Sequence, residues 1–331
     1  MKQRIAAIIK FFLKVIIIVF VTLILFECSY RWYVIDFYSF SWKGLNSPEN
    51  RSKENVDLLV FGDSFSANDH GYVSCLQKLC PGKVIVNASS AGIGIKQVNL
   101  FASKRIKQAN PKAILYQVYV GNDLIDVQNL SNWKSISIVR NLYWKITNQF
   151  MSISYLNQRM GALRKHETTK SLHLDEHFSK ELYDKRTTLF IKADTESIEK
   201  SVTLKDDFLK RYLVWKDELE VLLEKIPLTT KVYIAFIPHC AQINDFYIKN
   251  MTELGATFSD NNNFSKTDYA FFEYARNDFK GNTNVVFLNP LTFFKETDTA
   301  NYRLYYENDP HFNEHGNSEF ARYLKPLIFN E

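Results

Sequence analysis

Within Val56-Asp57-Leu58-Leu59-Val60-Phe61-Gly62-Asp63-Ser64-Phe65-Ser66, a short apolar run ends abruptly in Gly-Asp-Ser. A Leu- and Val-rich run of this length that stops at a glycine is typical of a buried strand, because it is too short for a helix. Ser64 is therefore expected at the carboxyl end of the strand, the edge where open α/β sheets form ligand crevices. A hydroxyl there is activated if a base reaches it, although the same tripeptide also occurs as an ordinary strand-to-helix turn with a serine cap.

Further strand-like runs follow, and they alternate with segments that have helical spacing. The strands are expected at residues 83–87, 113–120, 231–238 and 284–289, and the helices at residues 72–79, 97–108, 267–279 and 314–327. Such an alternation predicts a parallel sheet with right-handed crossovers. We therefore expect an α/β fold of the flavodoxin-like type, a three-layer sandwich in which helices cover both faces of about five parallel strands.

One long interval interrupts the alternation. Residues 129–227 are too many for a single crossover, and they contain charged and aromatic segments with helical periodicity at residues 133–150 and 206–226. They are expected to form a large helical insertion over the carboxyl edge of the sheet. Three aromatic side chains of the insertion either stack on a sugar or pack in a core: Trp144, Tyr155 and Trp215.

The first 33 residues are expected to form a transmembrane anchor. Residues 1–14 carry four basic and no acidic side chains, and residues 15–26 are apolar except for Thr22. The apolar segment is long enough to cross a bilayer, and the bulky residues after it do not resemble a signal-peptide cleavage site. The basic residues before the span predict a cytoplasmic N-terminus and an exported body, in the periplasm or outside the cell.

The composition fits one large domain at residues 56–331, preceded by a polar linker at residues 34–55. The net charge of +5 falls to +1 without the four basic residues of the anchor. The rest of the chain therefore lacks the strong positive charge that would indicate nucleic-acid binding. No spacing of cysteine and histidine resembles a zinc site, and neither a metal nor a nucleotide cofactor is implied. Cys75 and Cys80 either pair in an oxidising compartment or remain free thiols.

Between the last expected strand and the last expected helix, residues 305–316 place a histidine close to an aspartate. Pro310 keeps Asp309 out of the helical region, so the segment is expected to be an extended loop that enters the final helix. This loop also lies at the carboxyl edge of the sheet. His311 supplies a base near neutral pH and Asp309 a carboxylate to orient it, which are the partners that Ser64 lacks.

Four short blocks stand at strand ends in a fixed order: Gly62-Asp63-Ser64, Gly92, Gly121-Asn122-Asp123 and Asp309-Pro310-His311. In this pattern the sequence resembles the SGNH (GDSL-like) hydrolase family, over residues 57–327 without most of the insertion. The resemblance implies that Ser64 is the nucleophile, that His311 is the general base and that Asp309 orients it. It also implies an oxyanion hole made by the N–H groups of Ser64 and Gly92 and the Asn122 amide, with Gly62, Asp63, Gly121 and Asp123 in supporting positions.

The sequence departs from the family pattern at the acid. The family's acid precedes its histidine by three residues, where this chain has Asn308, whereas Asp309 precedes His311 by two. Either Asp309 or a backbone carbonyl is therefore expected to orient His311. Three rival bases occupy no matching strand-end loop: His70, His239 and His315, of which His315 is expected in the first turn of the final helix.

These features predict a serine acyl hydrolase or acyltransferase that works through a covalent acyl-enzyme. The Asp-x-His-x-Asn pattern at residues 309–313 is similar to that of polysaccharide O-acetyltransferases related to this family. Tethering outside the cytoplasm, with a large insertion over the site, suits an O-acetyl ester of a cell-surface or secreted polysaccharide as the expected substrate. Transfer to a sugar would also need a membrane protein that donates the acyl group, because no acyl-CoA site is evident. The alternatives are a lipase or thioesterase acting on membrane-derived acyl esters, and a non-catalytic binding or assembly component.

Overall fold

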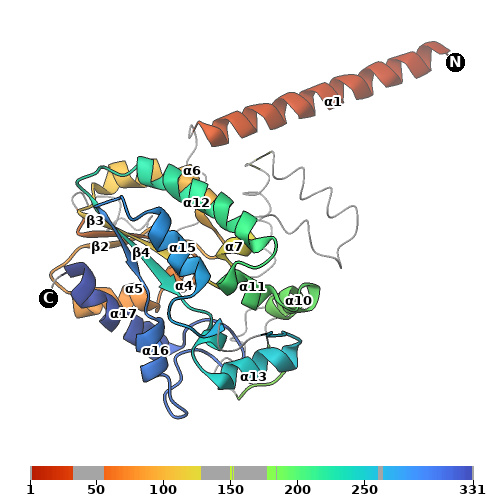
Figure 1. Ribbon diagram of the computed structural model, residues 1–331. Helices are drawn as coiled ribbons and strands as arrows, with labels where there is room; N and C mark the ends of the chain where they lie inside the picture. Colours follow the sequence, from red (N-terminus) through yellow and green to blue (C-terminus); the bar gives the residue numbers. More distant parts are fainter. Residues whose placement is uncertain are drawn as a thin grey trace.

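A computed structural model describes residues 2–32, 56–127, 150, 152, 177–183, 185–259 and 264–329. Its centre is a five-stranded sheet in the order β2-β1-β3-β4-β5 (Figure 1). The strands are β1 (Leu58–Phe61), β2 (Ile85–Asn87), β3 (Ala113–Tyr119), β4 (Lys231–Ile237) and β5 (Val285–Leu288). Every neighbouring pair is parallel, which confirms the α/β fold with five parallel strands.

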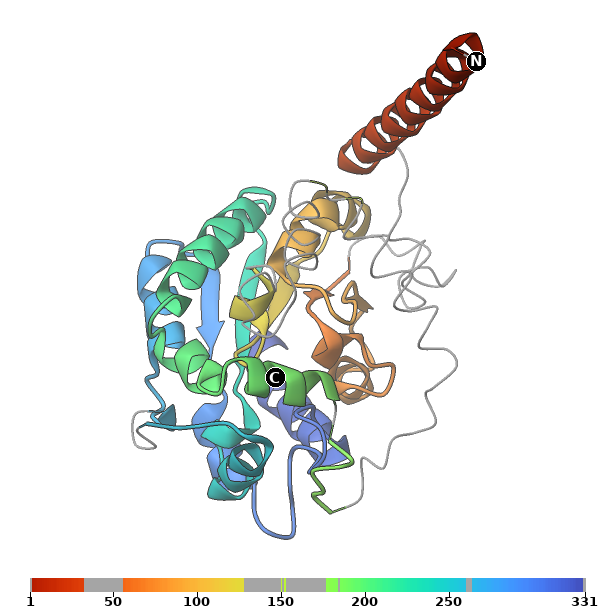
Figure 2. The ribbon, with the colours of Figure 1, turned by 90° about the vertical axis from the view of Figure 1, so that its right-hand side faces the viewer.

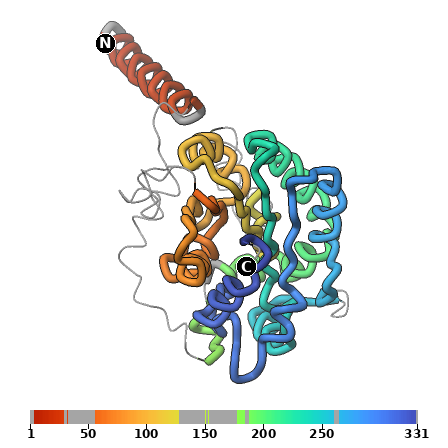
Figure 3. Tube along the Cα trace, turned by 90° about the vertical axis from the view of Figure 1, so that its left-hand side faces the viewer, coloured from red at the N-terminus to blue at the C-terminus, as the bar shows by residue number. Residues whose placement is uncertain are grey.

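Helices cover both faces of the sheet, as the views in Figures 2 and 3 show. One face packs against α5 (Tyr72–Leu79) and α17 (Glu314–Phe329), and the other against α6 (Ile95–Ala109), α12 (Phe208–Glu224) and α15 (Ala270–Asp278). Strand β4 reaches both layers, because successive side chains of a strand point to opposite faces. The hydroxyl of Tyr233 donates to the carbonyl of Ile328 in α17, whereas the ring of Phe236 lies 6.1 Å from that of Trp215 in α12.

The remaining helices lie in the connections. They are α4 (Ser64–Ala67), α7 (Asp123–Asp126), α10 (Lys185–Ala193), α11 (Ser197–Thr203), the 3-10 helix η2 (Cys240–Gln242), α13 (Asp245–Leu254) and α16 (Leu291–Thr297). The predicted insertion contributes α10, α11 and α12, and α11 lies against the end of β3, where the hydroxyl of Ser201 donates to the carbonyl of Val120. Trp215 is fully buried, so it packs in the core. Trp144, Tyr155, most of the helix expected at 133–150 and the linker at 34–55 lie outside the described residues.

The N-terminal helix α1 (Lys2–Arg31) is long and apolar enough between Arg4 and Ser29 to cross a membrane. A helix of this kind near the N-terminus has the properties of an anchor and of a signal sequence alike. Toward its C-terminal end, the carboxylate of Glu27 accepts hydrogen bonds from the backbone N–H and the hydroxyl of Ser152.

Strand β1 approaches its neighbour so closely that only glycine fits at its end. A Cβ on Gly62 would overlap the hydroxyl of Ser66 and would lie 2.5 Å from Oε1 of Gln117. Gln117 is fully buried in β3, and its Oε1 accepts hydrogen bonds from the N–H of Asp63 and the hydroxyl of Ser66. The contact between β1 and β3 therefore holds the Gly-Asp-Ser turn in place.

Replacing Gly62 by alanine (Gly62→Ala) is expected to lower the free energy of unfolding by about 1–3 kcal/mol, because the new methyl group displaces buried, hydrogen-bonded neighbours. Urea titration followed by circular dichroism would measure the change. Gly82→Ala is the matched control, since a Cβ at Gly82 has no atom within 4 Å. Equal urea midpoints for the two variants would show that the turn tolerates the methyl group.

Candidate active site

Ser64 is the first residue of α4, which begins directly after β1. The carboxylate of Asp63 accepts a hydrogen bond of 3.0 Å from the N–H of Phe65 and thereby caps the short helix. Asp63 is buried, and burial raises the pKa of its carboxyl while the N–H of Phe65 opposes the shift. Ser64 itself is half-buried, so its hydroxyl lies at the carboxyl edge of the sheet within reach of solvent.

The loop that carries the histidine folds back on itself. Tyr305 and Phe312 form an antiparallel bridge, and the N–H of Tyr306 donates to the carbonyl of His311 at 3.1 Å. Beyond the bridge, the side chain of Asn313 accepts a hydrogen bond from the N–H of Gly316 in the first turn of α17. The loop is therefore non-helical up to the final helix, as the sequence predicted, but it folds back on itself rather than running extended.

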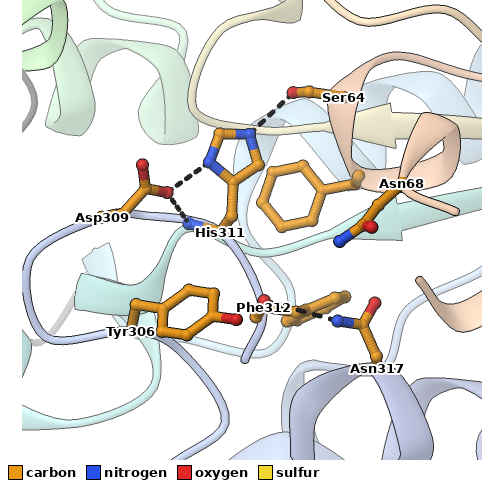
Figure 4. A pocket seen from close by; sticks show the side chains of 8 residues that line it. Ser64, Asn68, Tyr306, Asp309, His311, Phe312 and Asn317 are labelled. Atoms are coloured by element: carbon orange, nitrogen blue, oxygen red, sulfur yellow. Dashed lines mark hydrogen bonds and ion pairs between the residues drawn. The ribbon is translucent and has the colours of Figure 1, made fainter. Parts of the chain in front are cut away.

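The loop brings His311 against Ser64 (Figure 4). Nε2 of His311 lies 2.7 Å from Oγ of Ser64, and Nδ1 of His311 contacts Oδ1 of Asp309. The same carboxylate oxygen accepts a 2.8 Å hydrogen bond from the backbone N–H of His311. A carboxylate accepts hydrogen bonds only, so Nδ1 carries the proton and Nε2 is left to accept the one from Ser64. The carboxylate of Asp309, rather than a backbone carbonyl, orients the ring.

A cavity of about 180 Å³ opens beside the serine and the histidine. It is smaller than the pockets of several hundred Å³ that hold drug-sized ligands. Among the described residues, its lining consists of Ser64, Phe65, Asn68, Tyr306, Asp309, His311, Phe312 and Asn317. The ring of Phe65 lies 4.7 Å from that of His311 and fixes one face of the imidazole. This lining contains no lysine or arginine, so a neutral substrate group matches it.

The residues predicted for the oxyanion hole lie on loops at the same edge. The loop after β2 runs beside the Gly-Asp-Ser turn, because the N–H of Ser90 donates to the carbonyl of Gly62. Gly92 follows with a φ of 73°, which favours glycine, and a Cβ there would meet open space. Asn122 stands at the N-cap position of α7 directly after β3, and its Oδ1 is buried with no hydrogen-bond partner among the described residues. The oxyanion-donor roles of these residues stay predictions.

The supporting residues after β3 are packed tightly. A Cβ on Gly121 would lie 2.5 Å from the ring of Tyr119. The carboxylate of Asp123 accepts hydrogen bonds from the N–H of Tyr119 and the hydroxyl of Tyr116. Burial raises the pKa of the Asp123 carboxyl well above its ordinary value, and the nearby charge of Asp63 adds to the shift. Asp123 therefore fixes the strand end that presents Asn122.

Sequence reasoning missed two residues that shape the site. Gln117 holds the Gly-Asp-Ser turn from β3, and a single amide in an otherwise apolar strand is the signal that would have pointed to it. Asn308 is buried, and its side chain binds the backbone of residues 177 and 179. Asn308 stands where the family has its acid, and its amide is hydrogen-bonded to residues 177 and 179.

The contacts that the structure shows for the rival bases go to residues other than Ser64. His70 is exposed, and its N–H donates to the side chain of Asn68. His315 is the second residue of α17 and stacks on Tyr302 at 4.1 Å. His239 is buried after β4, where its Nδ1 accepts a hydrogen bond from the N–H of Ala241.

Burial lowers the pKa of His239 to about 3, so this ring is neutral at physiological pH. As the pH falls from about 6.5 toward 3, the unfolded chain gains a proton here that the folded protein does not, so acid lowers the stability. His239→Asn keeps an acceptor for Ala241 and removes the titration. Between pH 7 and pH 5 it is expected to lose less free energy of unfolding than the wild type, by on the order of 2 kcal/mol.

Urea midpoints at the two pH values would measure this difference. If the wild type and His239→Asn lose equal stability between pH 7 and pH 5, the ring of His239 titrates in the folded protein. It would then have to be reconsidered as a base.

The cysteines are free thiols, including the partly buried Cys75 and the buried Cys80. Of the two alternatives left open by the sequence, the structure shows free thiols at Cys75 and Cys80. In the part of the chain that the structure describes, no group of three or more His, Cys, Asp or Glu side chains is arranged to hold a metal ion.

No family model and no curated protein matches the sequence. The fold is similar to that of the acetyl xylan esterase AlAXEase, with 13% identity and a TM-score of 0.41 over 83% of this chain and 100% of that chain. A catalytic mutant of Axe2, an acetylxylan esterase from Geobacillus stearothermophilus, is 13% identical with a TM-score of 0.40, over 85% of this chain and 97% of that one. A lipase from a goat rumen metagenome is 11% identical with a TM-score of 0.38, over 83% and 98%.

These likenesses concern the fold. The arrangement of the site is independent of them: a serine hydroxyl hydrogen-bonded to a histidine, which is in turn bonded to a carboxylate, at the carboxyl edge of a parallel sheet. The same constellation performs acyl transfer on several unrelated folds, and it is recognised by geometry rather than by position in the chain.

Proposed function

We propose that the protein is a serine-dependent acyl hydrolase or acyltransferase that forms an acyl-enzyme on Ser64. The observation that supports this most directly is the 2.7 Å distance between Oγ of Ser64 and Nε2 of His311, with Asp309 on the far side of the ring. A serine hydroxyl is a weak nucleophile until a base within hydrogen-bonding distance removes its proton. His311 is that base, and Asp309 stabilises the imidazolium that forms.

The reaction proceeds in two halves. Oγ of Ser64 attacks the ester carbonyl as Nε2 of His311 takes its proton, and the tetrahedral oxyanion is held by the N–H groups of Ser64 and Gly92 and the amide of Asn122. The bond to the alcohol then breaks, and His311 returns the proton to the leaving oxygen. Water or a sugar hydroxyl then attacks the acyl-enzyme as His311 takes its proton. The bond between the acyl carbon and Oγ of Ser64 breaks, and His311 returns the proton to Oγ.

The proposed substrate is an O-acetyl ester on a cell-surface or secreted polysaccharide. A cavity of about 180 Å³ suits a short acyl group, and the absence of lysine and arginine from its described lining suits a neutral sugar. The apolar helix α1 would hold the enzyme at a membrane with its body outside the cytoplasm. If a sugar is the acceptor, a membrane protein would supply the acyl group.

The test uses the full-length protein in detergent and a fluorophosphonate probe, which reacts with activated serines. The wild type is expected to become labelled at Ser64, and His311→Ala is expected to lose labelling while it stays folded. Release of acetate from p-nitrophenyl acetate, with and without a polysaccharide oligomer, would then separate hydrolysis from transfer. Folded, monodisperse protein that takes up no label would reject the proposal in favour of a binding role.

Chain length of the acyl group separates the proposed substrate from the lipase alternative. Turnover of p-nitrophenyl esters is expected to fall steeply from acetate to octanoate, because the described part of the cavity, about 180 Å³, matches a short acyl group. Faster turnover of octanoate than of acetate would instead indicate a lipase or thioesterase.

A further inference from the structure

The side chain next to the triad acid is bound to another part of the chain. Asn308 is only 2% exposed. Its Oδ1 accepts a 2.7 Å hydrogen bond from the backbone N–H of Ser179, and its Nδ2 donates to the backbone carbonyl of His177 at 3.1 Å. Both halves of the amide are therefore satisfied by backbone groups, as in the pairing of two strands.

Glu307 extends the same contact. Its Oε2 accepts a 2.8 Å hydrogen bond from the backbone N–H of Phe178. Two consecutive side chains thus bind three backbone groups of residues 177–179, which belong to the predicted insertion. We call these contacts of Glu307 and Asn308 with residues 177–179 the backbone clamp.

The clamp contacts the tip of the histidine loop. The pairing of Tyr306 with His311 is the last backbone bond before residues 307–310, which form the tip. Asp309 lies at this tip, and its carboxylate must meet both the ring and the N–H of His311. A buried amide with two partners fixes the adjacent backbone more firmly than an exposed side chain would.

We propose that Asn308, supported by Glu307, is a positioning residue that sets the carboxylate of Asp309 against His311 through the backbone of residues 177–179. This inference rests on the proposed function for its kinetic consequence. Displacement of a catalytic group by about 1 Å can lower the rate roughly 100-fold. Loss of the clamp is therefore expected to act on the chemical step rather than on substrate binding.

Two substitutions at position 308 test the clamp on the full-length protein. Asn308→Ala removes both hydrogen bonds and is expected to lower kcat roughly 10- to 100-fold, with KM within about twofold of the wild-type value. Asn308→Asp is expected to lower kcat at least as much, because it turns a carboxylate oxygen toward the carbonyl of His177. The control is His177→Ala: it removes a fully exposed ring whose Nδ1 lies 3.6 Å from Oε1 of Glu307, and it leaves in place the backbone carbonyl that Asn308 binds.

A double-mutant cycle distinguishes positioning from general loss of structure. If Asn308 acts through Asp309, Asn308→Ala is expected to lower kcat much less in an Asp309→Asn background than in the wild type. Independent, additive losses would overturn the proposal. So would a kcat of Asn308→Ala equal to that of His177→Ala.

A readout that needs no activity keeps this inference separate from the proposed function. The proton on Nδ1 of His311 gives a downfield NMR resonance while it is bound to Asp309, and the resonance is assigned by its loss in His311→Ala. It is expected to weaken or shift in Asn308→Ala and to stay unchanged in His177→Ala. If the wild type takes up no fluorophosphonate, the proposed function fails, yet the resonance still decides the clamp: an unchanged signal in Asn308→Ala overturns it.

Discussion

Ser64→Ala is expected to lower kcat for acetyl ester hydrolysis by roughly 10⁴- to 10⁶-fold, because it removes the atom that forms the acyl-enzyme. His311→Ala is expected to lower kcat to a similar extent, since an unactivated hydroxyl gains little over water as a nucleophile. The double variant is expected to be no slower than either single one, because Ser64 and His311 act as a unit. Steady-state kinetics on p-nitrophenyl acetate would measure all three.

The control is His315→Ala, which removes an exposed ring that lies on Tyr302 and has no contact with the cavity lining. It is expected to keep kcat within a few-fold of the wild type. Thermal unfolding would confirm that Ser64→Ala is folded. Hydrolysis at the wild-type rate by folded Ser64→Ala would mean that the reaction proceeds through another nucleophile, and the mechanism proposed here would have to be abandoned.

Asp298→Ala is expected to have the largest effect on stability, about 3–5 kcal/mol. The side chain of Asp298 is fully buried and accepts four hydrogen bonds. The donors are Nη1 of Arg303 at 2.7 Å, the N–H of Leu304 and the hydroxyl of Tyr247 at 2.9 Å, and Nδ2 of Asn244 at 3.3 Å. Alanine would leave these donors and the guanidinium of Arg303 without their acceptor.

Urea unfolding would measure this loss, with Glu220→Ala as the control. Glu220 forms an i,i+4 pair with Lys216 and is 49% exposed, so its removal is expected to change the free energy of unfolding by less than about 1 kcal/mol. The hydroxyl of Tyr247 also accepts a hydrogen bond from the N–H of Tyr305 in the histidine loop. Asp298→Ala is therefore expected to loosen this loop as well. Equal urea midpoints for the two variants would contradict the role assigned to Asp298.

The fold could be predicted because its signals are local, and the residues that the structure brings together, Ser64, His311 and Asp309, lie in short blocks at strand ends. The strand before Ser64 is a continuous apolar run that a glycine ends, and the later strands repeat this pattern. The predicted ends of helices differ from the observed ones where a side-chain hydrogen bond sets the boundary. Helix α6 begins at Ile95 rather than near Gln97, because the Oε1 of Gln97 accepts a hydrogen bond from the N–H of Gly94 and the helix starts there.

The partner of His311 could not be decided from the sequence, because it depends on contacts between distant residues. Asn308 stands where the family has its acid, yet its amide binds backbone groups some 130 positions earlier in the chain. A side chain that hydrogen-bonds to backbone groups requires no particular residue types in the segment it binds. The contact therefore cannot be predicted from the sequence of that segment. The contact between Asp309 and His311 depends on the backbone conformation of the loop tip, residues 307–310.

The order of the chain also delays the assembly of the site. Ser64 and His311 are 247 positions apart, and α17 near the C-terminus packs on α5 near the start of the body, where Tyr72 meets Phe320. During synthesis, the segment with the serine leaves the ribosome long before the segment with the histidine. A growing chain therefore carries Ser64 before the histidine that pairs with it in the folded protein, and the site can form only after the segment with His311 has been made.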